Sequence, residues 1–334
     1  MTGKITGTGS CVPENRVTNQ DLAERMDTSD EWIRERTGIR CRHIISEGET
    51  TASLAAHAAE KAIEMAGIRP EELDLILLAT SSPNTQVPAI SCWVQAEIGA
   101  MNAACYDISA ACSGFVFAYN TAQAFIRAGM AKKVLVIGAD TISNLVNWED
   151  RSSCILFGDG AGAVVLETSE EEIPYYGVMH TDSRKIGALV AESRHQTIQP
   201  VAEQTYLRMD GKEIFKFALT RVPQVIREVL ALAECRAEDV DLFVLHQANG
   251  RIIESVVKKL GVTSEKVPVN VDEYANFSAG TIPVLLDQLN RAGKLEKGQK
   301  LVFSGFGAGL AWGAVYTEWQ MEKITGSSHD QKGE

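Results

Sequence analysis

The sequence predicts an α/β protein in which one α/β unit occurs twice. A ten-residue block that begins at Arg69, RPEELDLILL, matches RAEDVDLFVL, which begins at Arg236, at five positions. The same offset of 167 residues carries residues 133–138 onto residues 300–305. Two separated matches at one offset, half the length of this 334-residue chain, favour duplication over chance. Each block contains a continuous apolar run, which is typical of buried parallel strands.

Composition and charge describe a globular chain and exclude several classes of protein. The chain is 45% apolar, enough to form a large core, and carries a formal net charge of −12, which argues against a nucleic-acid partner. We expect no membrane association, because no run reaches the roughly 18 uncharged apolar residues of a span and the N-terminus does not resemble a signal peptide. Seven scattered cysteines without C-x-x-C pairs indicate neither a disulfide framework nor a zinc site, so a reducing cytoplasm fits best.

Local patterns predict the first elements in order. Residues 4–9 form an opening strand, and Thr18 or Asn19 can cap the helix that follows. The segment 29–42 carries four arginines and one tryptophan. A solvated helix with balanced charge is the commoner explanation of such a segment, and a platform for phosphate and adenine is the functional one. The alanine-rich segment 53–65 has helical periodicity and is expected to pack on a sheet.

Cys112 lies at the joint between a short buried strand, predicted for residues 103–108, and an apolar helix that ends at Gly129. In the first turn of a helix, unpaired N–H groups and the positive end of the dipole favour a thiolate. We therefore expect a lowered thiol pKa and a reactive nucleophile, with small neighbouring residues leaving room for a substrate. The alternative is a small buried hydrophobe, and this stretch alone does not separate the two.

The second half supplies two further polar candidates. His246 directly follows the predicted strand 240–245, and Asn276 lies in the loop before the helix of the second copy. Open α/β sheets place ligands at such positions, so a pseudo-twofold would bring Cys112, His246 and Asn276 to one crevice. Taken singly, such a histidine is more often a structural hydrogen-bonding residue and such an asparagine more often a turn former.

Two glycine-rich runs, residues 157–163 and 305–313, do not fit phosphate-binding motifs. Neither ends in Gly-Lys-Ser/Thr, and neither opens a helix after a strand with G-x-G-x-x-G. Each precedes a β-branched strand, which predicts a tight turn between antiparallel edge strands. Backbone N–H groups in such turns can serve an oxyanion.

The duplication predicts two halves and a tail. Residues 1–170 form the N-terminal half with the nucleophilic cysteine, and residues 171–324 form the C-terminal half with the histidine and asparagine. Residues 325–334 are polar and aperiodic, which predicts a disordered tail.

With these features assembled, the chain resembles β-ketoacyl-acyl-carrier-protein synthase III, the initiating condensing enzyme of the thiolase-like family. The resemblance covers nearly the whole chain and rests on five ordered motifs. These are TSDEWIxxRTGI at 28–39, SAACSGF at 109–115, FGDGAGA at 157–163, HQANxRI at 246–252 and NxSA at 276–279. It implies a thiolase-like, five-layered αβαβα subunit and a homodimer.

The resemblance also implies the chemistry. Cys112 takes an acyl primer from acyl-CoA as a thioester, and His246 and Asn276 act on the malonyl-acyl carrier protein that follows. The backbone N–H groups of Cys112 and Ala308 form the oxyanion site of acylation. Coenzyme A enters as the substrate thioester, and no permanently bound cofactor is expected.

Three sets of binding residues carry over by the same resemblance. The coenzyme A contacts are Trp32, Arg36, Arg151 and Asn249. The carrier-protein contacts are Arg251, Lys216, Lys258 and Lys259. The acyl-pocket residues are Val87, Ile142, Phe157 and Leu189.

Some positions depart from the family pattern. The stretch YANFSAGT, residues 274–281, stands where YGNTSAAS is usual, so Phe277 replaces a threonine. The usual Gly-Gly-Gly turn contains Ala308, which keeps its N–H but restricts φ. Val87 stands where acetyl-selective members carry phenylalanine, which predicts tolerance of longer or branched primers.

Three other functions compete with the condensing enzyme. A specialised-pathway ketosynthase or acyltransferase would use the same acyl-cysteine with another acceptor. A hydrolase of the Cys-His-Asn type would need His246 as a general base, so its substitution would abolish acylation. A non-catalytic acyl-binding subunit is disfavoured because all three polar site residues are present.

Overall fold

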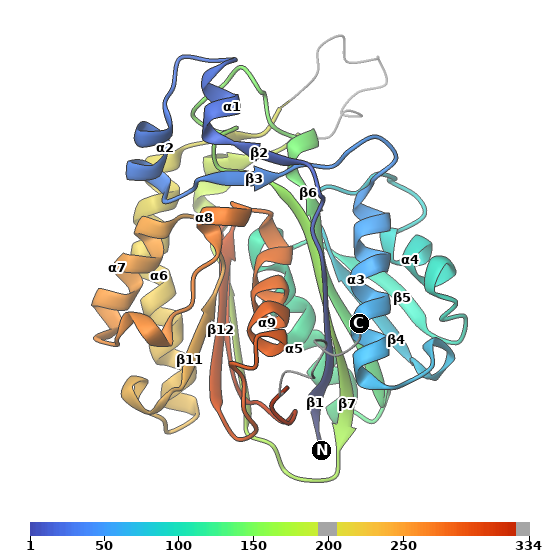
Figure 1. The fold of residues 1–334 in the computed structure, drawn as a ribbon. Helices are drawn as coiled ribbons and strands as arrows, with labels where there is room; N and C mark the ends of the chain where they lie inside the picture. The colour runs from blue at the N-terminus through green and yellow to red at the C-terminus, as the bar shows by residue number, and fades with distance from the viewer. Residues whose placement is uncertain (193–205, 325–334) are drawn as a thin grey trace, which may run out of the picture.

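The structure, a computed structural model, describes residues 1–192 and 206–324. These residues form a fold built around two large β-sheets (Figure 1). The strands of the first sheet are β1 (Thr2–Cys11), β4 (Leu75–Ala79), β5 (Ala104–Ile108), β6 (Lys133–Thr141) and β7 (Asp159–Ser169). Their order is β1-β7-β6-β4-β5. The strands of the second sheet are β8 (Tyr175–Thr181), β11 (Leu242–Leu245), β12 (Lys300–Gly307) and β13 (Ala311–Glu318). Their order is β11-β12-β13-β8.

Helices cover both faces of each sheet. The helices concerned are α3 (Thr51–Ala66), α4 (Ile90–Ile98), α5 (Gly114–Arg127), α6 (Gly211–Leu232), α7 (Gly250–Leu260) and α9 (Thr281–Arg291). In Figure 1 the layers run from α6 and α7 at the left, through one sheet, the central α5 and α9, and the other sheet, to α3 and α4 at the right. The predicted five-layered αβαβα fold is therefore confirmed.

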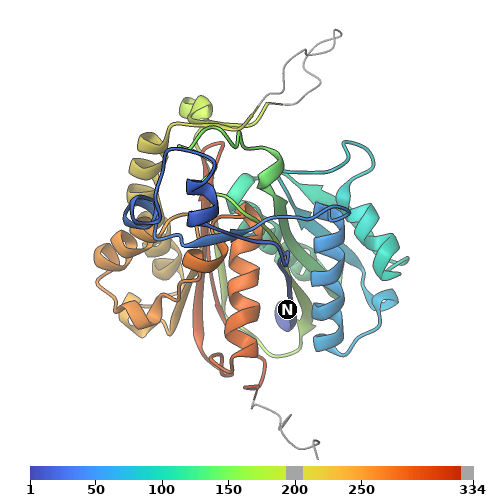
Figure 2. The same cartoon turned by 45° about the horizontal axis from the view of Figure 1, so that its top comes forward.

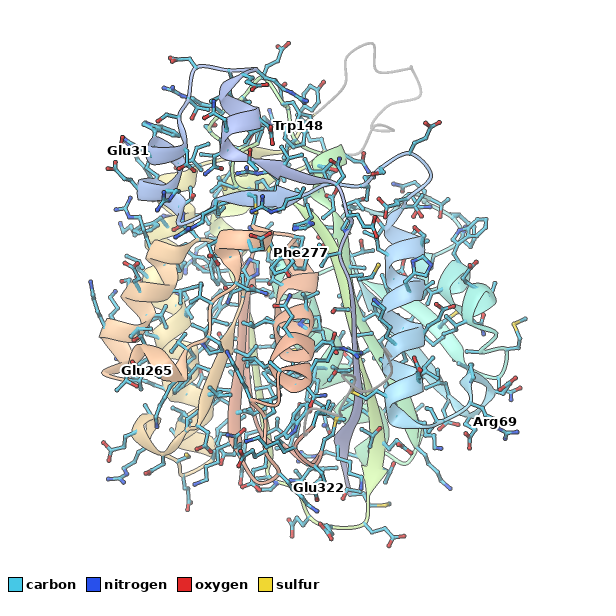
Figure 3. The ribbon with its side chains drawn as sticks, viewed as in Figure 1. Glu31, Arg69, Trp148, Glu265, Phe277 and Glu322 are labelled. Atoms are coloured by element: carbon cyan, nitrogen blue, oxygen red, sulfur yellow. The ribbon has the colours of Figure 1, made fainter. Side chains whose placement is uncertain are left out.

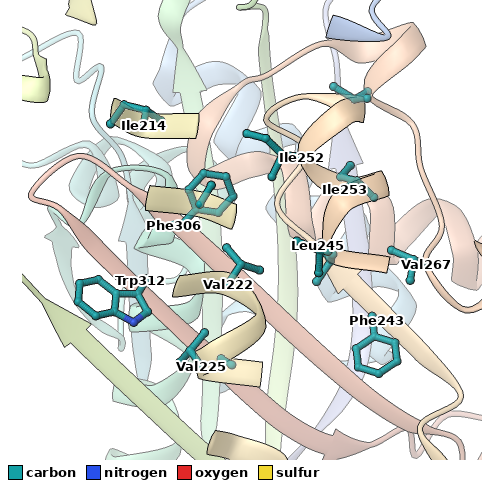
Figure 4. Packing of buried hydrophobic residues seen from close by; sticks show 14 of the residues in the cluster. Ile214, Val222, Val225, Phe243, Leu245, Ile252, Ile253, Val267, Phe306 and Trp312 are labelled. Atoms are coloured by element: carbon teal, nitrogen blue, oxygen red, sulfur yellow. The ribbon is translucent and has the colours of Figure 1, made fainter. Parts of the chain in front are cut away.

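The central strands explain this layering. β4 pairs in parallel with β5 and β6, and every residue of β4 is buried. β11 pairs in parallel with β12 in the second sheet. Strands that are apolar on both faces need helices on both sides, as the continuous apolar runs of the sequence predicted. Figure 4 shows part of the resulting core, where Val222 and Val225 of α6 pack near Phe306 and Trp312.

The duplication is visible in three dimensions at the entry to each central helix. A short 3₁₀ turn, η2 (Ala111–Ser113), precedes α5, and its counterpart η7 (Ser278–Gly280) precedes α9, at the same offset of 167 residues. The first residue of each turn has a left-handed backbone, with φ of 48° at Ala111 and 53° at Ser278. Such conformations are costly for non-glycine residues and persist where the surrounding structure fixes them.

Smaller elements cover the upper end of the two sheets, which Figure 2 turns toward the viewer. They are β2 (Arg16–Thr18), α1 (Asn19–Ala23), α2 (Asp30–Thr37), β3 (Cys41–His43) and α8 (Val271–Tyr274). Thr18, one of the two predicted caps, caps α1 with Asp21 in a capping box. The arginine-rich segment contains α2, which Ser29 caps and Gly38 ends with φ of 77°.

The remaining described elements are short. The two strands are β9 (Leu189–Val190) and β10 (Arg208–Met209), which pair with each other. The further 3₁₀ turns are η1 (Pro70–Glu72), η3 (Ile142–Asn144), η4 (Ser183–Ala188), η5 (Ala237–Asp239) and η6 (Ser264–Lys266). Among the described residues, no helix combines the length and the apolarity needed to cross a bilayer.

The strand before Cys112 was predicted to be buried, and this prediction was wrong. β5 is one of the two edge strands of the first sheet, with β4 as its only neighbour among the described strands. Ala104 and Tyr106 are consequently exposed. An apolar run of five residues does not show whether a strand has one neighbour or two, which is why the pattern misled.

The first glycine run was also misjudged. Most of residues 157–163 lie in β7, which pairs with both β1 and β6 and is not an edge strand. A Cβ atom at Gly162 would lie 2.6 Å from the backbone nitrogen of Val284 in α9, so the glycine permits close helix packing. In the second run, residues 308–310 form the predicted turn between β12 and β13. β13 is likewise not an edge strand, because it also pairs with β8.

Each sheet draws its strands from one half of the chain. The division predicted at residue 170 falls in the connection between β7 and β8. The halves nevertheless interlock, because α9 of the second half packs on β1 and β7 of the first. The predicted tail, residues 325–334, lies outside the described residues.

Candidate active site

Cys112 occupies η2, where the two halves meet. Its side chain is buried, with the residue 7% exposed. β12 of the second half lies directly against it: a Cβ atom at Gly307 would be 2.9 Å from the Cys112 nitrogen and 3.3 Å from its Sγ. Glycine is thus required on β12 because the cysteine fills the space that a side chain would take.

The protonation state of Cys112 differs from the sequence prediction. The pKa of the thiol is raised to about 12, mainly by burial; the Ser278 hydroxyl opposes this rise and the nearby Asp140 carboxylate adds to it. The predicted lowering of the pKa is therefore contradicted for the substrate-free chain. The sulfur lies in a turn ahead of α5 and is removed from water, so desolvation outweighs the field of the helix terminus. The resting group is a thiol, and acylation has to remove its proton.

His246 follows β11, as predicted, and is 2% exposed. Its backbone N–H donates to the Ser304 carbonyl oxygen at 2.9 Å, and its ring Nδ1 lies 2.7 Å from the Thr281 hydroxyl oxygen. Its ring meets the Phe306 ring edge to face, with centroids 5.3 Å apart. Burial lowers the pKa of the imidazole to about 3, so the ring is neutral near pH 7.

Asn276 lies immediately before η7 and is 6% exposed. Its backbone is fixed by a donated hydrogen bond to the Leu156 carbonyl and one accepted from the Gly158 N–H, each 3.0 Å long. Its side-chain Oδ1 accepts a hydrogen bond from the Ser278 N–H at 2.8 Å. Because the carboxamide oxygen is engaged in this turn, the NH₂ group is the part of the side chain that can serve a ligand.

The structure brings the elements that carry these three residues together. η2 packs on η7 and on β12. Thr281 joins the remaining pieces, since its hydroxyl contacts the His246 ring and also donates to the Ser278 carbonyl at 3.2 Å. The junction of the duplicated halves therefore holds a thiol, a neutral imidazole and a carboxamide.

The unusual Phe277 is accommodated within the fold and is fully buried (Figure 3). A Cβ atom at Gly160 would lie 3.0 Å from its ring, and one at Gly280 would lie 2.8 Å from it. Gly280 stands where the resembled motif has alanine, so the missing methyl group provides the room for the larger ring. The phenylalanine thus belongs to the packing of β7 and η7.

Ala308 is accommodated as well. It lies in the turn between β12 and β13, and the left-handed conformation in this turn is taken by Gly309, with φ of 130°. Ala308 is not among the residues with positive φ, so its methyl group causes no backbone strain.

The four predicted coenzyme A residues lie together on the outer surface. The guanidinium carbons of Arg36 and Arg151 lie 4.3 and 4.9 Å from the centroid of the Trp32 ring. Asn249 caps α7 by accepting a hydrogen bond from the Arg251 N–H, and its side-chain NH₂ donates to the Arg36 carbonyl at 3.1 Å. Planar cations beside an indole suit an adenine ring and phosphate groups.

The four predicted carrier-protein residues share the surface of α6 and α7. Arg251 lies over the Phe215 ring, 5.6 Å from its centroid, and Lys216 is the next residue of α6. Lys258 and Lys259 occupy the last turn of α7, where the Lys259 ammonium donates to the Leu219 carbonyl at 2.7 Å. All four side chains belong to exposed residues, so a local basic surface exists on this acidic chain.

The predicted acyl-pocket residues are only partly together. Ile142 and Phe157 belong to one buried cluster, and Leu189 packs against it. Val87 is 87% exposed and does not join them within this chain. A cavity of about 670 Å³ beside the β5–η2 junction is lined by residues that include Ser82, Asp107, Ser109, Leu145 and Leu207.

Sequence analysis missed Asp140, Ser278 and Thr281 as site residues. Asp140 lies in β6 and is fully buried, while Ser278 and Thr281 were noted only as small residues at a helix entry. One signal was available for Asp140, namely a carboxylate that directly follows an apolar strand. Its proximity to Cys112 depends on the packing of η7 against β6, which no local pattern reveals.

Together, the duplicated αβαβα fold and the similar proteins define an acyltransferase. Two family models match the chain: 3-oxoacyl-[acyl-carrier-protein] synthase III over residues 106–184, and the C-terminal part of the same family over residues 230–319. Among curated proteins, the β-ketoacyl-[acyl-carrier-protein] synthase III of Clostridium acetobutylicum is 44% identical over 95% of this chain and 98% of its own. That of Acaryochloris marina is 46% identical over 95% and 97%. The chain belongs to the β-ketoacyl-[acyl-carrier-protein] synthase III family.

Solved structures agree with this assignment. The 3-oxoacyl-[acyl-carrier-protein] synthase III of Aquifex aeolicus superposes with a TM-score of 0.89 at 44% identity, covering 95% of this chain and all of that one. The priming β-ketosynthase of the R1128 polyketide pathway superposes with a TM-score of 0.91 at 34% identity, covering 96% of each chain.

Proposed function

We propose that this protein condenses an acyl-CoA primer with malonyl-acyl carrier protein, with loss of carbon dioxide, through an acyl thioester on Cys112. The product is a β-ketoacyl-acyl carrier protein, and the reaction initiates fatty acid biosynthesis. The observation that carries the proposal is the packing of η2, which holds Cys112, against η7, which directly follows Asn276, and against β12, the strand beside the one that His246 follows.

In the acylation step, the Cys112 sulfur attacks the thioester carbonyl of acyl-CoA and coenzyme A leaves. A thiolate is both a good nucleophile and a good leaving group, so the acyl-cysteine can form and later be attacked. The backbone N–H groups of Cys112 and Ala308 stabilise the oxyanion. Support comes from the close approach of β12 to Cys112 at Gly307, which brings the following turn beside the sulfur.

In the condensation step, decarboxylation of the malonyl group places negative charge on its thioester oxygen. The His246 ring N–H and the Asn276 NH₂ stabilise this enolate, which then attacks the acyl-cysteine. The Thr281 hydroxyl has one proton and two acceptors in reach, Nδ1 of His246 and the Ser278 carbonyl oxygen. The proposed role requires the state in which this proton is donated to Nδ1, because the ring proton then lies on Nε2 and can be donated to the substrate. A neutral imidazole also does not readily protonate the carbanion that must attack carbon.

We also propose the substrate contacts and the assembly. Trp32, Arg36 and Arg151 hold the nucleotide end of coenzyme A, and Asn249 lies along the path of the pantetheine arm. The basic surface of α6 and α7 receives the acidic carrier protein through Lys216, Arg251, Lys258 and Lys259.

A homodimer is proposed because β5 leaves the edge of the first sheet unpaired within the described chain. Tyr106 on β5 and Trp93 on α4 are 37% and 49% exposed near this edge. Pairing of β5 with a second copy would cover the edge, as exposed edge strands require. Val87 could then complete the acyl pocket of the partner, with tolerance of longer or branched primers as the consequence. All seven cysteines are free thiols, which supports the reducing cytoplasm as the compartment.

A two-stage assay tests the function. The protein is incubated with radiolabelled acyl-CoA, freed of excess label, and mixed with malonyl-acyl carrier protein. We expect a labelled protein in the first stage, and labelled β-ketoacyl product with carbon dioxide in the second. No adduct and no carbon dioxide would contradict the proposal.

A specialised-pathway ketosynthase remains the second candidate, supported by the similarity to the R1128 priming β-ketosynthase. A labelled adduct that malonyl-acyl carrier protein fails to discharge, but another acceptor discharges, would favour it. A primer panel of acetyl-, isobutyryl-, butyryl- and octanoyl-CoA in the same assay identifies the preferred acyl group. His246→Ala distinguishes a hydrolase from a condensing enzyme. The substitution would abolish acylation of Cys112 in a hydrolase and largely spare it in a condensing enzyme.

A further inference from the structure

The buried hydroxyl of Ser278 forms no hydrogen bond within the described chain. Ser278 is 2% exposed, and its Oγ atom has no hydrogen-bond partner among the described residues. It lies in η7, which packs on η2 and on β6. The hydroxyl is close enough to the Cys112 thiol and to the Asp140 carboxyl to lower the pKa of both, although no formed hydrogen bond joins them. A buried hydroxyl without a partner is rare in folded proteins and calls for an explanation.

Asp140 is a second group whose pKa the Ser278 hydroxyl affects. It is fully buried, and within the described residues its oxygens face hydrogen-bond donors and no cation. Its Oδ1 accepts from the Thr80 hydroxyl, the Ser81 N–H and the Ser82 hydroxyl. Its Oδ2 accepts from the Ala279 N–H at 3.2 Å, one residue beyond Ser278. Burial raises the pKa of this carboxyl, which makes it a stronger base than an exposed aspartate.

The duplication explains how Ser278 comes to lie beside Cys112. It occupies the position of Ala111, the residue before the cysteine, and shares its left-handed backbone. The backbones of η7 and β6 are also in close contact, since a Cβ atom at Gly138 would lie 2.2 Å from the Ala279 carbonyl oxygen. The second copy therefore supplies a hydroxyl where the first supplies a methyl group, and this hydroxyl lowers the pKa of both the Cys112 thiol and the buried Asp140 carboxyl.

We propose that Ser278 and Asp140 together accept the thiol proton of Cys112 during acylation, a role that rests on the proposed acyl-cysteine chemistry. As the sulfur–carbon bond forms, the thiol proton passes to Ser278 Oγ and the hydroxyl proton of Ser278 passes to Asp140. As the bond to coenzyme A breaks, Ser278 protonates the departing thiolate and regains a proton from Asp140. The step consumes one thioester and one thiol and forms one thioester and one thiol, so no other reactant is needed.

His246 is less suited to this task. Its Nδ1 is engaged with Thr281, and burial makes its ring a weak base. In this proposal Asp140 acts through Ser278 and is a positioning residue with a proton-accepting role, while Ser278 exchanges the proton with the sulfur.

Asp140→Asn provides a test in which two readouts move in opposite directions. Removal of the negative charge lowers the pKa of Cys112, so alkylation of Cys112 by iodoacetamide, followed by peptide mass spectrometry, should begin at lower pH than in the wild type. Removal of the base should slow single-turnover acylation by acyl-CoA on the order of 10²-fold near pH 7. The variant should also lose the decline in acylation rate that the wild type shows as Asp140 is protonated at low pH.

Ser278→Ala should slow acylation to a similar extent, while decarboxylation of malonyl-acyl carrier protein, which uses His246 and Asn276, stays near the wild-type rate. Ser10→Ala and Asp287→Asn are the matched controls, because Ser10 donates to the buried Asp287 at 2.6 Å in another part of the fold. Both controls should acylate like the wild type.

Three results would overturn the inference. The first is acylation at the wild-type rate in Ser278→Ala or Asp140→Asn. The second is an equal loss of acylation and decarboxylation, which assigns Asp140 and Ser278 to the support of η7 alone. The third is slower acylation and slower alkylation together in Asp140→Asn. If Asp140→Asn does not fold, Ser278→Ala decides alone. If the wild type is acylated by no primer, the proposed function is refuted instead. The two failures are distinguishable, because the alkylation profiles of the wild type and Asp140→Asn can still be compared.

Discussion

Gly307→Ala is expected to disable acylation of Cys112 while the fold persists. The added Cβ atom would lie 2.9 Å from the Cys112 nitrogen, 3.0 Å from its Cβ and 3.3 Å from its Sγ. Contacts this short do not persist, so β12 or η2 has to move. The atom under most pressure is the backbone nitrogen whose N–H is the proposed oxyanion donor. The substitution therefore acts on geometry at the reacting centre without removing any catalytic side chain.

The structure sets the expected magnitudes. Overpacking of one methyl group into a filled site costs about 1–3 kcal/mol of unfolding free energy. Misplacement of one oxyanion donor costs on the order of 10²–10³ in rate. We expect single-turnover acylation to fall by about 10²-fold, with a loss of stability that leaves the protein folded at 25 °C.

Intact-protein mass spectrometry after rapid mixing with acyl-CoA measures the acylation rate, and thermal unfolding measures stability. Gly187→Ala is the matched control, since Gly187 is exposed and a Cβ atom there would meet nothing within 4 Å. Acylation of Gly307→Ala within threefold of the wild type, at unchanged stability, would refute the close approach of β12 and the oxyanion assignment that depends on it.

Four further predictions concern other parts of the site. His246→Ala should leave acylation largely intact and slow decarboxylation of malonyl-acyl carrier protein on the order of 10²–10³-fold, measured as released carbon dioxide. The pKa of His246 is about 3 in the folded chain and about 6.5 in the unfolded chain. Between these values the unfolded state binds more protons than the folded state. The contribution of this histidine to stability should therefore fall as the pH drops below about 6.5. Trp32→Ala should raise KM for acyl-CoA with kcat nearly unchanged, in steady-state kinetics. Arg251→Glu should raise KM for the carrier protein, with a smaller effect at high salt.

Controls and contrary outcomes are specific to each change. Loss of acylation in His246→Ala would contradict the first prediction and indicate that His246 is a hydrolase-like general base. For the second prediction, the free energy of unfolding in urea is compared at pH 7 and pH 5, and its change with pH should be smaller in His246→Asn than in the wild type. An unchanged KM for acyl-CoA in Trp32→Ala removes the nucleotide platform from the account. Arg69→Glu, an exposed charge reversal in the first half, is the control for Arg251, and an equal effect of both changes contradicts a local docking surface.

The sequence predicted the duplication and the catalytic candidates because both leave local signals. The offset of 167 residues locates η2 and η7 at equivalent positions, and the motifs around Cys112, His246 and Asn276 mark the ends of apolar strands and helix entries. Strand ends converge in a layered α/β fold, so residues distant in the chain could be assigned to one crevice.

The errors share a physical cause, since each depends on what packs from elsewhere in the chain. The exposure of β5 depends on the absence of a second neighbouring strand among those described, and the raised pKa of Cys112 depends on burial by β12 and η7. Phe277 looked like a departure at the site, and its fit depends on missing methyl groups at Gly160 and Gly280. Asp140 was overlooked because its partners come from a loop after β4 and from η7.

The measurement closest to the central claim is peptide mapping of the acylated protein. After incubation with acyl-CoA, the added mass should lie on the peptide that contains Cys112, should disappear when malonyl-acyl carrier protein is added, and should be absent from Cys112→Ala. An acyl group found on any of the other six cysteines, or β-ketoacyl product formed by Cys112→Ala, would contradict the account.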